Sequence, residues 1–168
     1  MFFESNGDTD VNLSDWTPLE VASAKSAVAA GFQWWSDTLD LEGSVHELNF
    51  EFDFTKADAP LETRIESSVR FLDDAMLAID DFRIDSGYDI SGRESFFDRY
   101  FDINKFNAEL REANQTDWAI TVFVFRESFV EGPTASALQG GPWIILAGID
   151  AIQREHFAHE VGHVFHVS

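Results

Sequence analysis

The last ten residues, HEVGHVFHVS, contain side chains that can bind a metal ion and move a proton. His159 and His163 are four residues apart, and Glu160 directly follows the first histidine. In a helix, residues i and i+4 lie one above the other, so both imidazoles can reach one ion at about 2.0–2.1 Å. Glu160 then lies at the flank of the pair and can accept a proton from metal-bound water. The spacing predicts one catalytic zinc ion with His159 and His163 as ligands and Glu160 as general base.

The residues around this motif indicate a helix with two unlike sides. At about 100° per residue, four histidines share one stripe: His156, His159, His163 and His166. The opposite side is apolar and consists of Phe157, Ala158, Val161, Val164 and Phe165. We therefore expect the apolar side to pack on the core and the histidines to face a cleft. A surface histidine cluster without a metal is the alternative interpretation.

The motif with Gly162 between its histidines resembles the active-site helix of the zincin metallopeptidases, especially the metzincin-like bacterial secreted type. The family pattern is HExxHxxGxx followed by a histidine or aspartate as third zinc ligand. The resemblance implies a third ligand at position 169, after Ser168, so the sequence looks truncated at the active-site helix. With that ligand missing, we expect weak zinc binding and slow hydrolysis.

His166 departs from the family pattern because it stands where the family has glycine. That glycine lets the chain turn sharply out of the helix. His166 is therefore a rival third ligand, although one straight helix surrounds a tetrahedral ion poorly. His156 is a weaker rival and is expected to face solvent.

Composition limits the class of protein. The 168 residues are 45% hydrophobic, enough for a single domain over 1–168 with a sizeable core. The net charge of −20 disfavours nucleic acid and anionic membranes as partners, and the absence of cysteine excludes thiolate sites. No apolar run reaches the roughly 18 residues of a membrane span, and MFFESNG does not resemble a signal peptide. A secreted or cell-surface location is implied by the resemblance and by the acidic, cysteine-free composition.

Patterns along the chain predict the elements that hold the motif. Thr17, Pro18 and Glu20 have the types and spacing of a helix start, and this helix continues to about residue 35. Its residues Val21, Ala24, Val28 and Trp35 fall on one apolar face, so this helix should pack on a sheet. Helices are also expected through most of 61–113, on one side of a sheet, and over 149–165. Strand patterns occur at residues 2–4, 44–54, 118–125 and 142–148, with 126–141 as a loop or edge segment. The order predicts an α+β fold with a mixed sheet, similar to the N-terminal subdomain of a zincin or metzincin that ends in the active-site helix.

The predicted function is a zinc-dependent endopeptidase domain that acts on peptide or protein substrates. The resemblance also implies an edge strand that binds the substrate in extended form, and the segment 134–140 is a candidate for it. The alternative is a non-catalytic metal-binding or adhesin-like surface domain on a zincin fold; another zinc hydrolase is a third option. Asp8, Asp10 and Asn12 alternate as in a calcium loop, but the glycine and final glutamate of that loop are missing, so a solvated loop is favoured over structural Ca²⁺.

Overall fold

The computed structural model describes residues 1–8, 15–65, 73–128, 133–148 and 154–165. The strands are β1 (Phe2–Ser5), β2 (Leu61–Thr63), β3 (Thr121–Phe125), β4 (Ala135–Ala137) and β5 (Trp143–Ala147). The helices are α1 (Pro18–Leu41), α2 (Asp73–Asp85), α3 (Phe96–Asn114) and α4 (Arg154–Val164). Among the described residues, no helix combines the length and hydrophobicity needed to cross a membrane.

The strands form one mixed sheet in the order β2-β1-β3-β5-β4. Neighbouring strands are parallel except at one edge, where β4 runs antiparallel to β5. Phe123 of β3 lies opposite Ile145 of β5, and both are buried, as expected for central strands. The α+β class and the mixed sheet predicted from the sequence are confirmed, and the candidate edge segment 134–140 does contain the edge strand β4.

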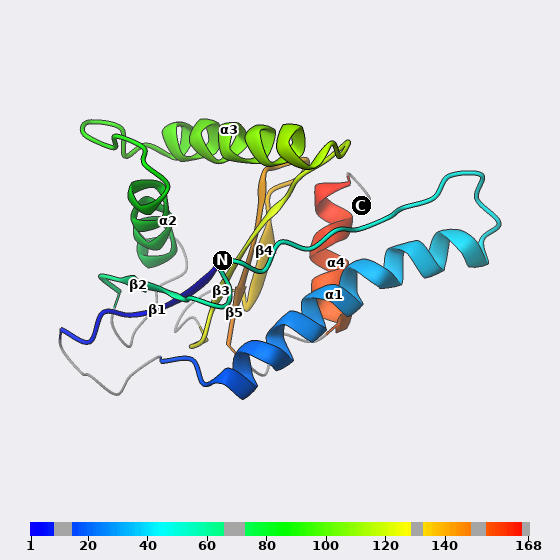
Figure 1. The fold of residues 1–168 in the computed structure, drawn as a ribbon, viewed down its shortest axis with the longest axis horizontal. Coiled ribbons are helices and arrows are strands. Elements are labelled where there is room, and N and C mark those ends of the chain that lie inside the picture. The colour runs from blue at the N-terminus through cyan, green and yellow to red at the C-terminus, as the bar shows by residue number, and fades with distance from the viewer. Residues whose placement is uncertain (9–14, 66–72, 129–132, 149–153, 166–168) are drawn as a thin grey trace.

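Each face of the sheet is covered by a different pair of helices (Figure 1). Ile79 of α2 and Ile103 of α3 pack on one face with Phe3 and Phe123. Val28 of α1 and residues of α4 pack on the other face. The expectation that the helices within 61–113 lie on one side of the sheet is therefore correct.

Helix α1 begins at the predicted residues. The Thr17 side chain accepts a hydrogen bond from the Glu20 backbone, and the Glu20 carboxylate accepts one from the Thr17 backbone N–H at 2.8 Å. This capping box satisfies N–H groups that have no partner inside the helix. The helix extends to Leu41, beyond the predicted end near residue 35. Its apolar stripe, with Ala24 and Val28 buried, faces the sheet as predicted.

The predicted strand over residues 44–54 is wrong, since this segment forms no strand. It returns from the end of α1 (cyan in Figure 1), and its aromatic rings pack on that helix. The Phe50 ring centroid lies 4.8 Å from that of Phe32. The alternating pattern therefore reflects rings at every second residue that lie against a helix, half-buried at Phe50 and 39% exposed at Phe52.

Two further boundaries differ from the expectations. Residues Leu61–Thr63, expected to be helical, form β2 because they pair in parallel with β1, where Thr63 lies beside Ser5. Strand β3 begins at Thr121, after Trp118, which is 65% exposed. Three residues are too few for a periodic pattern, so only the pairing with β1 identifies β2.

Candidate metal centre

Two imidazoles from one turn of α4 face each other. Nε2 of His159 lies 3.1 Å from Nε2 of His163, and the ring centroids are 4.6 Å apart. Neither ring forms a hydrogen bond with any other described residue. His159 is exposed and His163 is half-buried, so the pair is accessible from solvent. The predicted i and i+4 arrangement therefore brings two imidazole nitrogens to one place.

This geometry fits a zinc ion. Two nitrogens at 2.0–2.1 Å from a tetrahedral ion are separated by about 3.3 Å. The observed separation of 3.1 Å is close to that value, so the pair needs little rearrangement to bind one ion. Ligand atoms of His159, Glu160 and His163 all lie within 4.8 Å of one another. The donor set is thus two imidazoles with a carboxylate beside them.

Glu160 is more buried than the histidines, with 8% of its surface exposed. Burial raises the pKa of the Glu160 carboxyl because the ionised form loses hydration. Electrostatic interactions with His163 and His159 and a hydrogen bond from the backbone of Ala137 act in the opposite direction but are weaker. A carboxylate with a raised pKa is a stronger base and is suited to accept a proton.

Exposure along α4 follows the predicted stripes. Phe157, Val161 and Val164 are buried in the core between α1 and the sheet. His156 and His159, on the other side, are exposed. The segregation predicted from the sequence is therefore confirmed for the described part of the helix. His166, the rival third ligand, lies outside the described residues, as do Asp10 and Asn12 of the calcium-like loop.

The close approach of α1 to α4 depends on a glycine. A Cβ at Gly31 would lie 2.4 Å from Cδ1 of Phe157, so only glycine allows the Phe157 ring to occupy this position. The ring of Phe32, one residue further along α1, meets the Phe157 ring edge-to-face at 4.9 Å. Helix α4 is therefore packed directly on α1.

Two contacts of α4 were not indicated by the sequence. The indole N–H of Trp35 donates to the Ala158 carbonyl at 2.8 Å, and the backbone N–H of Gly140 donates to the His163 carbonyl at 3.1 Å. Trp35 was expected only on the apolar face of its helix, and Gly140 only as part of a loop. No pattern in the sequence indicates either hydrogen bond, since both join residues that are far apart along the chain.

Comparisons of this chain with protein families, with curated proteins and with solved structures find no match.

Proposed function

We propose that this chain is a zinc-dependent peptidase domain of the zincin type, in which His159 and His163 bind zinc and Glu160 is the general base. The observation that carries the proposal is the 3.1 Å separation of the two Nε2 atoms beside a buried carboxylate. The third ligand, at position 169 or at His166, belongs to the proposal and lies outside the described residues.

The residues have distinct roles in the proposed reaction. When bound, zinc supplies a Lewis acid that polarises a carbonyl and lowers the pKa of a water molecule. His159 and His163 hold the ion through Nε2. Glu160 accepts the proton of the attacking water and donates it to the leaving amine. Its burial raises the pKa of the carboxyl above its usual range, which makes Glu160 a stronger base than an exposed glutamate.

The edge strand β4 supports a peptide as substrate. In the described part of the sheet, β4 pairs only with β5, so no described strand pairs with its outer edge, where the Ala137 backbone donates to Glu160. An extended peptide can add to such an edge through main-chain hydrogen bonds. The influence of the Ala137 backbone on Glu160 places this strand beside the carboxylate. A peptide paired with β4 would therefore lie near the proposed general base.

Metal titration combined with a hydrolysis assay tests the proposal. Wild type, His163→Ala, Glu160→Gln and His156→Ala are titrated with Zn²⁺ and then incubated with a fluorescently labelled protein substrate, with and without a chelator. We expect His163→Ala to lose metal binding and Glu160→Gln to keep it. Hydrolysis by wild type should be slow but zinc-dependent, and Glu160→Gln should reduce its rate by about 10²–10⁴-fold.

His156→Ala is the matched control, since this exposed histidine shares the helix but not the proposed ligand pair. It should retain both zinc binding and hydrolysis. Hydrolysis that survives in Glu160→Gln would show that the proposed mechanism is wrong. Zinc binding without any hydrolysis by wild type would favour the non-catalytic metal-binding domain instead.

A further inference from the structure

The segment from His159 to His163 is bracketed by two hydrogen bonds to other parts of the molecule. The carbonyl of Ala158, immediately before the first histidine, accepts the Trp35 indole N–H from α1. The carbonyl of His163 accepts the Gly140 N–H from the turn that follows β4. One bond comes from a helix and the other from the sheet side, so the turn that carries both imidazoles is held at its two ends.

The bond from Trp35 is additional to those of the helix. In an α-helix the carbonyl of residue 158 already accepts the N–H of Gly162, four residues on. A carbonyl oxygen has two lone pairs, and the indole uses the second one. The helix does not need this bond for its own backbone hydrogen bonds. The effect of the bond is therefore to fix the position of α4 relative to α1.

The bond from Gly140 acts at the opposite end of the turn. The carbonyls in the last turn of a helix lack donors within it, and that of His163 is one of these. Gly140 has a φ of 62°, a left-handed conformation that glycine adopts without strain. This turn brings its N–H to the second histidine, so the carbonyl is satisfied by a group belonging to the edge of the sheet.

The surroundings of Trp35 make it a rigid anchor. Its ring contacts Trp34 and Phe165 edge-to-face, with centroids 5.1 and 6.4 Å away. One turn earlier on α1, Gly31 and Phe32 receive the Phe157 ring. The indole is thus attached to the part of α1 that already packs on α4, and a tryptophan side chain has only two rotatable bonds to order.

We propose that Trp35 is a positioning residue for the His159–His163 pair and that, together with the Gly140 amide, it holds the two imidazoles at metal-binding distance before any ion arrives. This inference rests on the proposed function, because it assigns a role in a site that must first bind metal. A preorganised pair avoids the cost of ordering on binding. Removal of the indole N–H should therefore weaken metal affinity through the geometry of the ligands.

The test is a Co²⁺ titration of apo-protein followed by visible absorption, in wild type, Trp35→Phe and Trp16→Phe. Trp16→Phe is the matched control because the Trp16 indole N–H also donates to a backbone carbonyl, that of Phe3 in β1 at 2.8 Å, which does not belong to α4. We expect Trp35→Phe to weaken Co²⁺ affinity by roughly tenfold, the lower end of the effect of removing groups that orient ligands. Its d–d absorption bands should also change, whereas affinity and bands in Trp16→Phe should match wild type.

Thermal unfolding of the same apo-proteins separates positioning from general stability. If Trp35→Phe lowers Tm but binds Co²⁺ with wild-type affinity and spectrum, Trp35 is merely structural and the inference is overturned. If wild type itself binds no Co²⁺, the proposed metal site is wrong, and the inference about Trp35 is wrong with it. Failure of the proposed function is thereby distinguished from failure of the inference alone, in which wild type still binds Co²⁺.

A measurement on wild type tests the inference even if the Trp35→Phe variant folds poorly. With ¹⁵N-labelled tryptophan, the indole N–H that bonds to Ala158 should exchange slowly with solvent in the apo-protein. Its resonance should shift when Zn²⁺ is added, while that of Trp16, whose indole donates to Phe3 of β1, should not. A Trp35 indole that exchanges freely and does not respond to zinc would also overturn the inference.

Discussion

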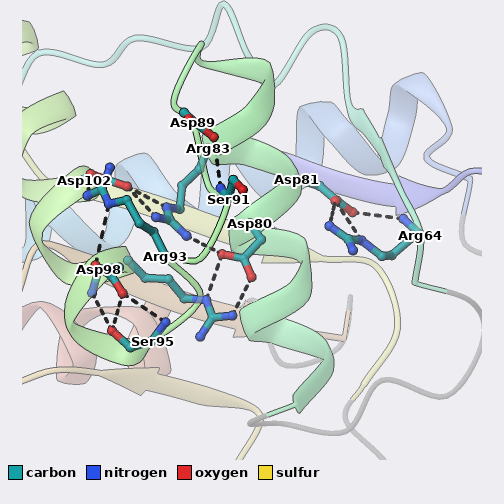
Figure 2. Close-up of polar contacts among 11 residues, drawn as sticks. Arg64, Asp80, Asp81, Arg83, Asp89, Ser91, Arg93, Ser95, Asp98 and Asp102 are labelled. Atoms are coloured by element: carbon teal, nitrogen blue, oxygen red, sulfur yellow. Dashed lines mark hydrogen bonds and ion pairs between the residues drawn. The ribbon is translucent and has the colours of Figure 1, made fainter.

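The polar side chains on the two faces of the sheet differ in the partners that they have within the protein. On the α1/α4 face, the imidazoles of His159 and His163 hydrogen-bond only with each other among the described residues, and the Glu160 carboxylate is buried beside them. On the α2/α3 face, the buried side chains of Arg83, Asp80 and Asp102 bind one another in an ion-pair network (Figure 2). One face therefore leaves donor atoms free to bind a ligand, and the other uses them within the fold.

Arg83 is the centre of the network on the α2/α3 face. Its side chain is 0% exposed and donates to Asp80 at 2.6 Å and to Asp102 at 2.9 Å. Arg99 also binds Asp80, and Arg93 binds Asp102, so each buried carboxylate has two guanidinium partners. Buried charges are tolerated when they are paired and hydrogen-bonded in this way.

The difference suggests which buried polar groups belong to structure and which to function. The ionised groups that join α2 to α3 all have oppositely charged partners. The groups on α4 would be costly if they served the fold alone, since burial disfavours the ionised form of Glu160 and no cation pairs with it among the described ion pairs. The following four predictions test this contrast, beginning with the largest expected effect.

Substitution Arg83→Ala should destabilise the protein most. It leaves the carboxylates of Asp80 and Asp102 buried with fewer partners, and breaking a buried ion pair costs about 3–5 kcal/mol. Urea unfolding measures the loss. Arg64→Ala is the control, because the ion pair of Arg64 with Asp81 is partly exposed and should contribute only about 0.2–1 kcal/mol. Equal losses in the two variants would contradict the assigned role of the buried network.

Substitution Gly31→Ala should disturb the packing of α1 on α4, on the other face of the sheet. An alanine in a helix interior usually stabilises by about 0.5–1 kcal/mol relative to glycine. Here the new Cβ would meet the buried Phe157 ring at 2.4 Å, so overpacking should instead destabilise by about 1–3 kcal/mol. Metal affinity should fall as α4 is displaced, which Co²⁺ titration detects. Ser26→Ala, on the exposed side of α1, should change neither property.

The N-terminal caps of α1 and α3, one on each face of the sheet, should contribute equally to the free energy of unfolding. Thr17 caps α1 and Ser95 caps α3, each in a complete capping box. Thr17→Ala and Ser95→Ala should each cost about 1 kcal/mol in thermal or urea unfolding. A clearly larger loss in one variant would show that the cap also supports the tertiary contacts of its own face.

The pH dependence of stability should have opposite signs at two carboxyls. Hydrogen bonds from Ser95 lower the pKa of Asp98 from 3.8, so its contribution is present above that pH and is lost as pH falls through the folded-state pKa. Burial raises the pKa of Glu160 from 4.5, so the unfolded state ionises first and stability decreases as pH rises above 4.5. These are the smallest expected effects.

Urea unfolding of apo-protein between pH 3 and 7 measures both contributions. Asp98→Asn should remove part of the loss at low pH, and Glu160→Gln should remove part of the loss above pH 4.5. If Glu160→Gln left the upper part of the profile unchanged, burial of this carboxyl would not carry the assigned cost.

The sequence alone determined the features that arise from local periodicity and capping. The start of α1 follows from Thr17 and Glu20, because the capping box involves residues three apart. The approach of His159 to His163 follows from 3.6 residues per turn. The buried strands β3 and β5 follow from continuous apolar runs, since a strand covered on both faces needs no alternation.

Only the tertiary structure decided which distant groups meet. Strand β2 exists through its pairing with β1, and the rings of residues 44–54 alternate because they pack on α1 instead of entering the sheet. The indole of Trp35 meets the carbonyl of Ala158 across 123 positions of sequence. Such contacts depend on the mutual position of elements that are already folded, and no local pattern of residue types records that position.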